Sequence, residues 1–520
     1  MKRVLSTLAV VLALLIVVLP SSAATRREKG EIERKRSENL ERFFKRDYDK
    51  LNTSFAGRVR ELAQWAAGKG LGTEAAELWT LAKSLDPDVE GDQPKAADAQ
   101  PSDDDKAAFK NKKELVFDQQ SNDLFKLGFN CYKAGLIGRA YDMVWETVRF
   151  NPDASKAQKL LGKVKYNDEW MGIYEAVQIK AGRVFKDEYG WVSKTDLAKY
   201  EQGLMPLKEK WLPREQVEQA RSSWTSAWVL DTEHYHIRNN VGLADAVAFG
   251  KILEDNYKLF FRVFIGYFSS KSQTEMLFGN RQEKRLMNVN YFATKEEFQK
   301  NVGVQVGDGV IGLYNPMRRS ASFYKLDWGT NVRVLKHEAT HQLLTESRRG
   351  ATGGLLPGAW VVEASSTYME TCYRKEGKIV TEGRNAGWVQ AFNAIARAGK
   401  DMPLEDFDQL NYQAFQGAGI GYPEAAALAC FLMEAEDGNY RERFLDYIEA
   451  HYTGRLGRGE LEKFMGVSYN DLEDEFHKFI LAAPAPQTPP PTTDPKKDAG
   501  KKDEPPKKPD DGKKDGGEKK

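Results

Sequence analysis

The chain has 520 residues, enough for about two to four domains, and 41% of them are hydrophobic, so most of the chain is expected to fold. The 77 Lys and Arg residues are balanced by 76 Asp and Glu residues. This balance argues against nucleic acid as the main partner, since phosphate binding requires a basic excess or a clustered basic face. Three widely spaced cysteines exclude a disulfide-stapled scaffold and a cysteine-type zinc ribbon, and they leave open whether one pair forms a bridge.

The N-terminal residues 1–24 have the pattern of an export signal. Lys2 and Arg3 form a positive start, residues 4–19 are apolar, and small residues at 22–24 suit a cleavage site. The apolar stretch is short for a membrane span, so we expect cleavage, with a retained N-terminal anchor as the alternative. The mature protein is then expected in the periplasm or outside the cell, with no transmembrane span.

Two segments, 62–88 and 127–153, match each other at a separation of 65 residues without a gap. Each predicts a helix, a turn at Gly70-Leu71 or Gly135-Leu136, a second helix and a proline-containing stop. This pattern resembles tetratricopeptide-type helical hairpins. The two units serve either as a surface for a protein partner or as a helical platform that packs on the rest of the chain.

The region after the hairpins predicts an α+β domain. Residues 170–225 read as mostly polar and helical, with tryptophans as packing anchors. Strand patterns follow at residues 227–237, 286–292 and 321–324, with an amphipathic helix at 242–260 and almost only helix after residue 332. Strands followed by helices indicate a small mixed sheet with a mostly helical C-terminal part.

The C-terminal segment is of low complexity. It lacks aromatic residues, contains nine of the twenty prolines and carries repeated lysine pairs, so it is expected to be disordered, either as a tether to anionic polymers or as a solubilising extension. The expected organisation is a signal peptide (1–24), a first hairpin unit (25–89), an acidic polar linker (90–113), a second unit with a helical extension (114–225), the α+β domain (226–480) and the tail (481–520).

The strongest chemical signal is the motif His337-Glu338-Ala-Thr-His341. Spacing of i, i+4 places both imidazoles on one helical face, where they can bind one metal ion, and Glu338 beside them can take a proton from water. A break at residues 353–358 allows the chain to turn back into a second helix that would bring Glu363 to the metal. Two imidazoles and one carboxylate leave an open position, as catalytic zinc requires.

A histidine motif of this kind followed by Trp360-x-x-Glu363 resembles the gluzincin metallopeptidases, and in particular an uncharacterised branch of exported bacterial proteins with tetratricopeptide-like N-terminal helices. The resemblance implies a zincin-like domain, a Zn²⁺ cofactor and hydrolysis of a peptide or protein substrate with Glu338 as general base. The aminopeptidase pattern of the second helix is also matched at Tyr368 and Glu370. It is not matched at Ala364 and Ser366, where Gly and Ala are usual.

A downstream segment beginning Gly421-Tyr422-Pro423 resembles the helix whose tyrosine stabilises the oxyanion in that clan, so Tyr422 is a second candidate catalytic residue. The strand whose glutamate holds the free amine in aminopeptidases is absent. The nearest segment, Gly312-Leu313-Tyr314-Asn315, carries no acid. The sequence therefore favours an endopeptidase over an aminopeptidase.

A different function remains open at this point: a catalytically inactive, metal-binding envelope scaffold that uses the helical repeats for protein–protein interaction. His234 and His236 share one face of a predicted strand but have no matching carboxylate or cysteine pattern, so they are interpreted as polar strand residues. His451 and His477 are expected at the surface.

Overall fold

The computed structural model describes residues 26–268, 285–348, 358–375, 377–457 and 459–483. The expected signal peptide and the tail from residue 484 onward lie outside these described residues. Residues 481–483, which were assigned to the tail, differ from the expectation: Leu481 is the last residue of helix α21, and Ala483 is only 5% exposed.

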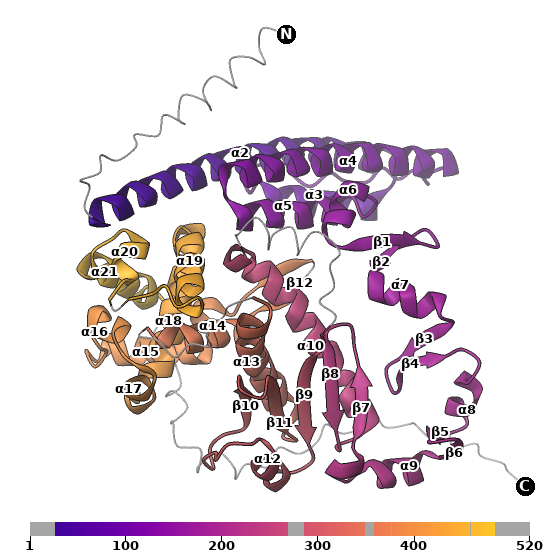
Figure 1. The fold of residues 1–520 in the computed structure, drawn as a ribbon. Coiled ribbons are helices and arrows are strands. Elements are labelled where there is room, and N and C mark those ends of the chain that lie inside the picture. Colours follow the sequence, from indigo (N-terminus) through magenta and orange to yellow (C-terminus); the bar gives the residue numbers. More distant parts are fainter. Residues whose placement is uncertain (1–25, 269–284, 349–357, 376, 458, 484–520) are drawn as a thin grey trace, which may run out of the picture.

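Two helical hairpins form the N-terminal part, as the repeat predicts (Figure 1). Their helices are α2 (Arg26–Gly68), α3 (Gly72–Leu85), α4 (Asp103–Ala134) and α5 (Ile137–Phe150). Gly135 ends α4 in the left-handed conformation, with φ of 88°, and its N–H bonds to the carbonyl groups of Cys131 and Tyr132. The glycine of each Gly-Leu pair thus makes the turn between paired helices.

The second half of the expected linker, by contrast, is helical. Helix α4 begins at Asp103 because Ser102 forms a capping box with Asp105 and because acidic side chains occupy the first turn. Negative charge at this end of a helix complements the helix dipole and satisfies free N–H groups. The acidic residues that suggested a linker therefore form the first turn of α4.

The expected helical extension is wrong in its secondary structure. After α6 (Ser155–Leu160), the chain forms three successive units of a two-stranded hairpin and a short helix, which follow one another beside the α+β domain (Figure 1). The units are β1 (Lys163–Tyr166), β2 (Glu169–Gly172) and α7 (Ile173–Lys180); β3 (Arg183–Lys186), β4 (Gly190–Ser193) and α8 (Leu197–Glu201); and β5 (Leu204–Leu207), β6 (Lys210–Pro213) and α9 (Arg214–Arg221). Each unit has a tryptophan at the second residue of its second strand: Trp170, Trp191 and Trp211. This regular spacing was the sequence signal for the three repeated units.

The α+β domain contains a five-stranded mixed sheet, which confirms the predicted fold class. Its strands are β7 (Trp228–Asp231), β8 (Tyr235–Asn239), β9 (Met287–Phe292), β10 (Gly312–Asn315) and β11 (Ser320–Tyr324). The order is β10-β11-β9-β8-β7, with parallel pairing of β9 to both neighbours and antiparallel pairing at the two ends. Strand β10 was not predicted, and the predicted strand at 227–237 is a hairpin of two strands.

Helices pack against this sheet and continue to the C-terminal end of the described chain. They are α10 (Leu243–Val263), η2 (Ile265–Phe268), α12 (Lys295–Asn301), α13 (Trp328–Glu346), α14 (Trp360–Thr371), α15 (Gly387–Arg397), α16 (Leu404–Asp408), α17 (Tyr412–Gly417), α18 (Gly421–Glu434), α19 (Arg441–Tyr452), α20 (Leu461–Met465) and α21 (Tyr469–Leu481), with the short hairpin β12 (Tyr373–Lys375) and β13 (Lys378–Val380) after α14. One apolar core joins the sheet to most of these helices, and Phe298 of α12 packs in a separate apolar cluster with Phe292 of β9 and Tyr324 of β11. In the part of the chain that the structure describes, no helix is both long and apolar enough to span a membrane.

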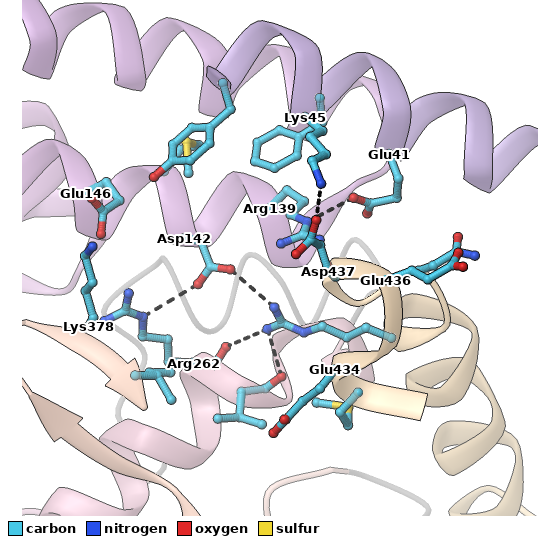
Figure 2. Close-up of a pocket in the computed structure, with 18 of the residues that line it drawn as sticks. Glu41, Lys45, Arg139, Asp142, Glu146, Arg262, Lys378, Glu434, Glu436 and Asp437 are labelled. Carbon is cyan, nitrogen blue, oxygen red and sulfur yellow. Dashed lines mark hydrogen bonds and ion pairs between the residues drawn. The ribbon is translucent and has the colours of Figure 1, made fainter. Parts of the chain in front are cut away.

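The helical hairpins dock onto the α+β domain through ion pairs around a cavity of about 920 Å³ (Figure 2). Asp142 of α5 lies between Arg262 of α10, at 3.6 Å, and Arg441 of α19, at 3.3 Å. Lys45 of α2 pairs with Asp437, which follows α18. The hairpins are thus a platform fixed to the domain by charged groups on both sides.

Replacing Asp142 by Ala is expected to destabilise the protein by at least about 2 kcal/mol, because two guanidinium groups lose their shared partner; a fully buried pair loses roughly 3–5 kcal/mol. Arg262 and Arg441 have side chains only 5% and 15% exposed. The matched control is Asp187→Ala, whose partner Lys251 is 54% exposed and which should change stability little. Denaturant unfolding of both variants checks this, and equal midpoints would contradict a stabilising role for Asp142.

Candidate metal centre

Helix α13 carries the histidine motif and is held in place at its start and along its buried face. The Asp327 side chain accepts a hydrogen bond from the N–H of Thr330 at 2.9 Å and so caps the helix. Leu335, Ala339 and Leu343 are fully buried in the core shared with the sheet. The two histidines are partly buried and lie at the edge of this packed face.

Helix α14 supplies the third predicted ligand. Trp360 at its first turn is fully buried, stacks on Phe444 and Tyr447 of α19, and donates to Asp408 at 3.0 Å. This anchoring fixes the first turn of α14, in which Glu363 points toward α13. Most of the break expected at residues 353–358 lies outside the described residues, so the connection between the helices is not described.

The structure brings the three predicted ligands together. One ligand atom each from His337, His341 and Glu363 lies within 4.8 Å of the others. The Oε2 atom of Glu363 is 3.0 Å from Nε2 of His337 and 3.6 Å from Nε2 of His341. Both imidazoles therefore present the same ring nitrogen to one carboxylate oxygen.

The other ring nitrogens have partners of their own on α14. Nδ1 of His337 is 2.7 Å from Oε1 of Glu370, and Nδ1 of His341 is 3.0 Å from the hydroxyl oxygen of Ser366. Such partners fix the ring orientation and leave Nε2 free to bind a metal. Ser366, a departure from the aminopeptidase pattern, thus supplies a hydroxyl group that orients His341. Sequence reasoning missed this role, although the helical spacing of 363, 366 and 370 is a signal for it.

Charge at the site suits a cation. Burial alone would raise the pKa of Glu363, but the two imidazoles outweigh burial and hold its pKa well below the usual range. Burial would likewise lower the pKa of His337, but its hydrogen bonds to Glu363 and Glu370 raise the pKa well above the ordinary value. The buried carboxylate is therefore ionised, and a metal ion would displace the proton of His337.

Glu338 does not belong to the group of ligands and points to strand β10 instead. Its Oε2 atom accepts a hydrogen bond from the N–H of Tyr314 at 2.7 Å. Close approach of β10 to α13 depends on Gly312, because a Cβ at this position would lie 2.5 Å from Val334 and 3.1 Å from Cγ of Glu338. A backbone N–H of an edge strand thus fixes the position of the Glu338 carboxylate.

Among the tyrosines whose pKa the charge of Glu363 raises are one on α17 and one on α18. Burial, followed by the charge of Glu363, raises the pKa of Tyr422, whose ring lies between Trp388 and Phe415 at centroid distances of 5.9 and 5.5 Å. The pKa of Tyr412 on α17 is also raised by burial and by Glu363, with which its hydroxyl interacts. The structure therefore keeps the predicted Tyr422 near the site and adds Tyr412, for which no motif in the sequence gave a signal.

Other histidines differ from their predicted roles. Nδ1 of His234 lies 2.7 Å from Oε2 of Glu254 on α10, and Glu233 completes a second group of potential ligands, so the expectation that no carboxylate matches His234 is wrong. Glu254 already accepts hydrogen bonds from the hydroxyl of Thr232 and the N–H of His234, and these bonds fix the β7–β8 turn to α10. The expected surface residue His451 is fully buried.

Searches with this chain against protein-family models, curated proteins and solved structures found no match. The case for a function therefore rests on the residues of the site and their geometry.

Proposed function

We propose that this protein is an exported, zinc-dependent endopeptidase of the gluzincin type. The observation that carries the proposal is the convergence of two imidazole Nε2 atoms on the Glu363 carboxylate, beside Glu338, which is not one of the ligands. Two histidines and one carboxylate are a donor set that catalytic zinc uses with one position left open. The hydrogen-bond partners on both Nδ1 atoms support this assignment, since they leave the Nε2 atoms for the metal.

We assign both proton transfers of the proposed hydrolysis to Glu338. The chemistry that zinc supplies when bound is Lewis-acid activation of a water molecule and of a carbonyl group. The Glu338 carboxylate accepts the proton of the attacking water and then delivers it to the leaving amine. Its hydrogen bond from the Tyr314 N–H holds the carboxylate in place for both transfers.

Strand β10 is the surface on which an extended substrate would bind. It is an edge strand of the five-stranded sheet, paired to β11 on one side among the described residues. A peptide can pair with such an edge through its backbone groups, which fits a peptide or protein substrate of varied sequence. The absence of an acidic side chain in Gly312–Asn315 leaves no group to hold a free amine there, and this favours internal cleavage.

The proposal is tested with a library of peptides blocked at the N-terminus. We expect the zinc-loaded protein to produce internal cleavage products, a chelator to stop cleavage, and added zinc to restore it. Zinc binding at about one equivalent or more without any cleavage of folded or peptide substrates would favour the inactive scaffold instead. Cleavage that persists without metal would contradict both.

Replacing Tyr422 by Phe is expected to lower kcat/KM by about ten- to a thousandfold, because one donor to the developing oxyanion is lost while Glu338 is kept. Tyr412→Phe is the matched control: this side chain is 40% exposed and interacts with Glu363, so the effect should be smaller. Zinc content should be unchanged in both variants. A larger loss in Tyr412→Phe than in Tyr422→Phe would transfer the oxyanion role to Tyr412.

A further inference from the structure

A second group of potential metal ligands lies in the C-terminal helices and plays no part in the proposed reaction. Its members are Asp401, between α15 and α16, and Glu473 and His477, both on α21. Nε2 of His477 is 2.7 Å from Oδ2 of Asp401, with side chains 30% and 12% exposed. Glu473 and His477 are four residues apart, so they share one face of α21, which is the spacing that lets two side chains bind one ion.

A third acidic side chain near this cluster is almost completely buried. Glu424 of α18 is 1% exposed, and its Oε2 atom has no hydrogen-bond partner among the described residues. Burial raises the pKa of Glu424 to about 8; a hydrogen bond from the Met402 backbone opposes this shift, and the charges of Asp401 and Glu473 add to it. A buried carboxyl oxygen without a partner is costly in a folded protein. A cation bound by the cluster would neutralise the charges of Asp401 and Glu473 near this buried group.

We propose that Asp401, Glu473 and His477 form a second, structural site for a divalent transition-metal cation such as Zn²⁺, with the buried Glu424 near the site but outside the group of ligands. One imidazole and two carboxylates are a donor set suited to zinc rather than to calcium or magnesium, which prefer oxygen ligands alone. The site does not depend on the proposed peptidase activity.

The position of the cluster indicates what the ion would do. Asp401 belongs to the connection before α16, Glu473 and His477 to α21, and Glu424 to the first turn of α18. Glu473 already accepts a hydrogen bond from the N–H of Leu404 at 3.0 Å, so the cluster joins this connection to α21. A bound ion would fasten α21 to the connection between α15 and α16.

Zinc counting on the full chain separates this site from the candidate catalytic centre. After dialysis against zinc and removal of free ion, mass spectrometry of the metal should give about two ions per chain for the wild type and about one for His341→Ala. Adding His477→Ala to His341→Ala should remove the remaining ion. The matched control is His236→Ala, an exposed histidine paired with Asp231, which should keep both ions.

The milder variants His477→Gln and Asp401→Asn keep side-chain size and provide the same test if His477→Ala does not fold. We expect each to lose one zinc and to lower the melting temperature only when zinc is present. The proposal is overturned if the His341→Ala protein binds no zinc, or if its zinc is unaffected by changes at 401 and 477. The wild type could also bind only one zinc. If that zinc is kept by His341→Ala and lost by His477→Ala, the result upholds this site and contradicts the catalytic one.

Discussion

Replacing Glu338 by Gln is expected to reduce cleavage of an N-terminally blocked peptide at least about a hundredfold while zinc remains bound. Gln keeps the size of the side chain and can keep the contact to the Tyr314 N–H, but it cannot accept a proton from water. General-base catalysis contributes about 10²–10⁴-fold, roughly 3–5 kcal/mol of barrier. The loss should appear in kcat more than in KM, because the proton transfer belongs to the transition state.

The matched control is Glu405→Gln, the same chemical change at an exposed position of α16. It should leave both activity and zinc content unchanged. Equal rates for Glu338→Gln and the wild type would remove Glu338 from the mechanism. Loss of zinc from Glu338→Gln would instead show that Glu338 is a ligand, contrary to its place beside β10.

Replacing Glu363 by Ala is expected to have the second large effect, the loss of zinc from the candidate catalytic centre. Two imidazoles then remain of a three-ligand site, and the hydrogen bond of Glu363 to His337 is lost as well. The matched variant is Glu370→Gln, which keeps all three candidate ligands and changes the partner of His337 Nδ1, with loss of the half-exposed ion pair to Arg333; it should weaken zinc binding by about 10–100-fold.

Competition with a chromogenic chelator measures both variants. Zinc affinity should also fall as the pH falls, because His337 has a raised pKa in the metal-free protein and protons compete with the ion. Full zinc affinity in Glu363→Ala would show that the third ligand is a different residue. A larger loss in Glu370→Gln than in Glu363→Ala would assign the ligand role to Glu370.

The three candidate ligands could be predicted from the sequence because each is marked by a local pattern. His337 and His341 lie one turn apart on α13, and Glu363 follows a recognisable helix start at Trp360. Tyr412, by contrast, reaches Glu363 only through the packing of α17, and nothing in its sequence surroundings distinguishes it. The same holds for Glu254, which meets His234 only after α10 packs against β8.

In the fold, too, features marked by a local sequence pattern could be predicted and others could not. The hairpin helices were predicted because each glycine turn follows a long helical pattern, whereas strands β1 to β6 have four residues each and contain too few alternations to be distinguished from loops. Asn167, Asp168 and Lys208 occupy hairpin turns with positive φ; Asn and Asp favour this conformation, whereas Lys208 gives no such signal. Strand β10 was not predicted because it, too, has only four residues.

Crystallography with anomalous diffraction at the zinc absorption edge tests the central claim most directly. On zinc-loaded protein, a peak should lie about 2.0–2.2 Å from Nε2 of His337, Nε2 of His341 and a carboxylate oxygen of Glu363, with the remaining position not taken by a protein side chain. The absence of a peak at these three residues, or a fourth side chain that closes the coordination sphere, would contradict a catalytic zinc centre.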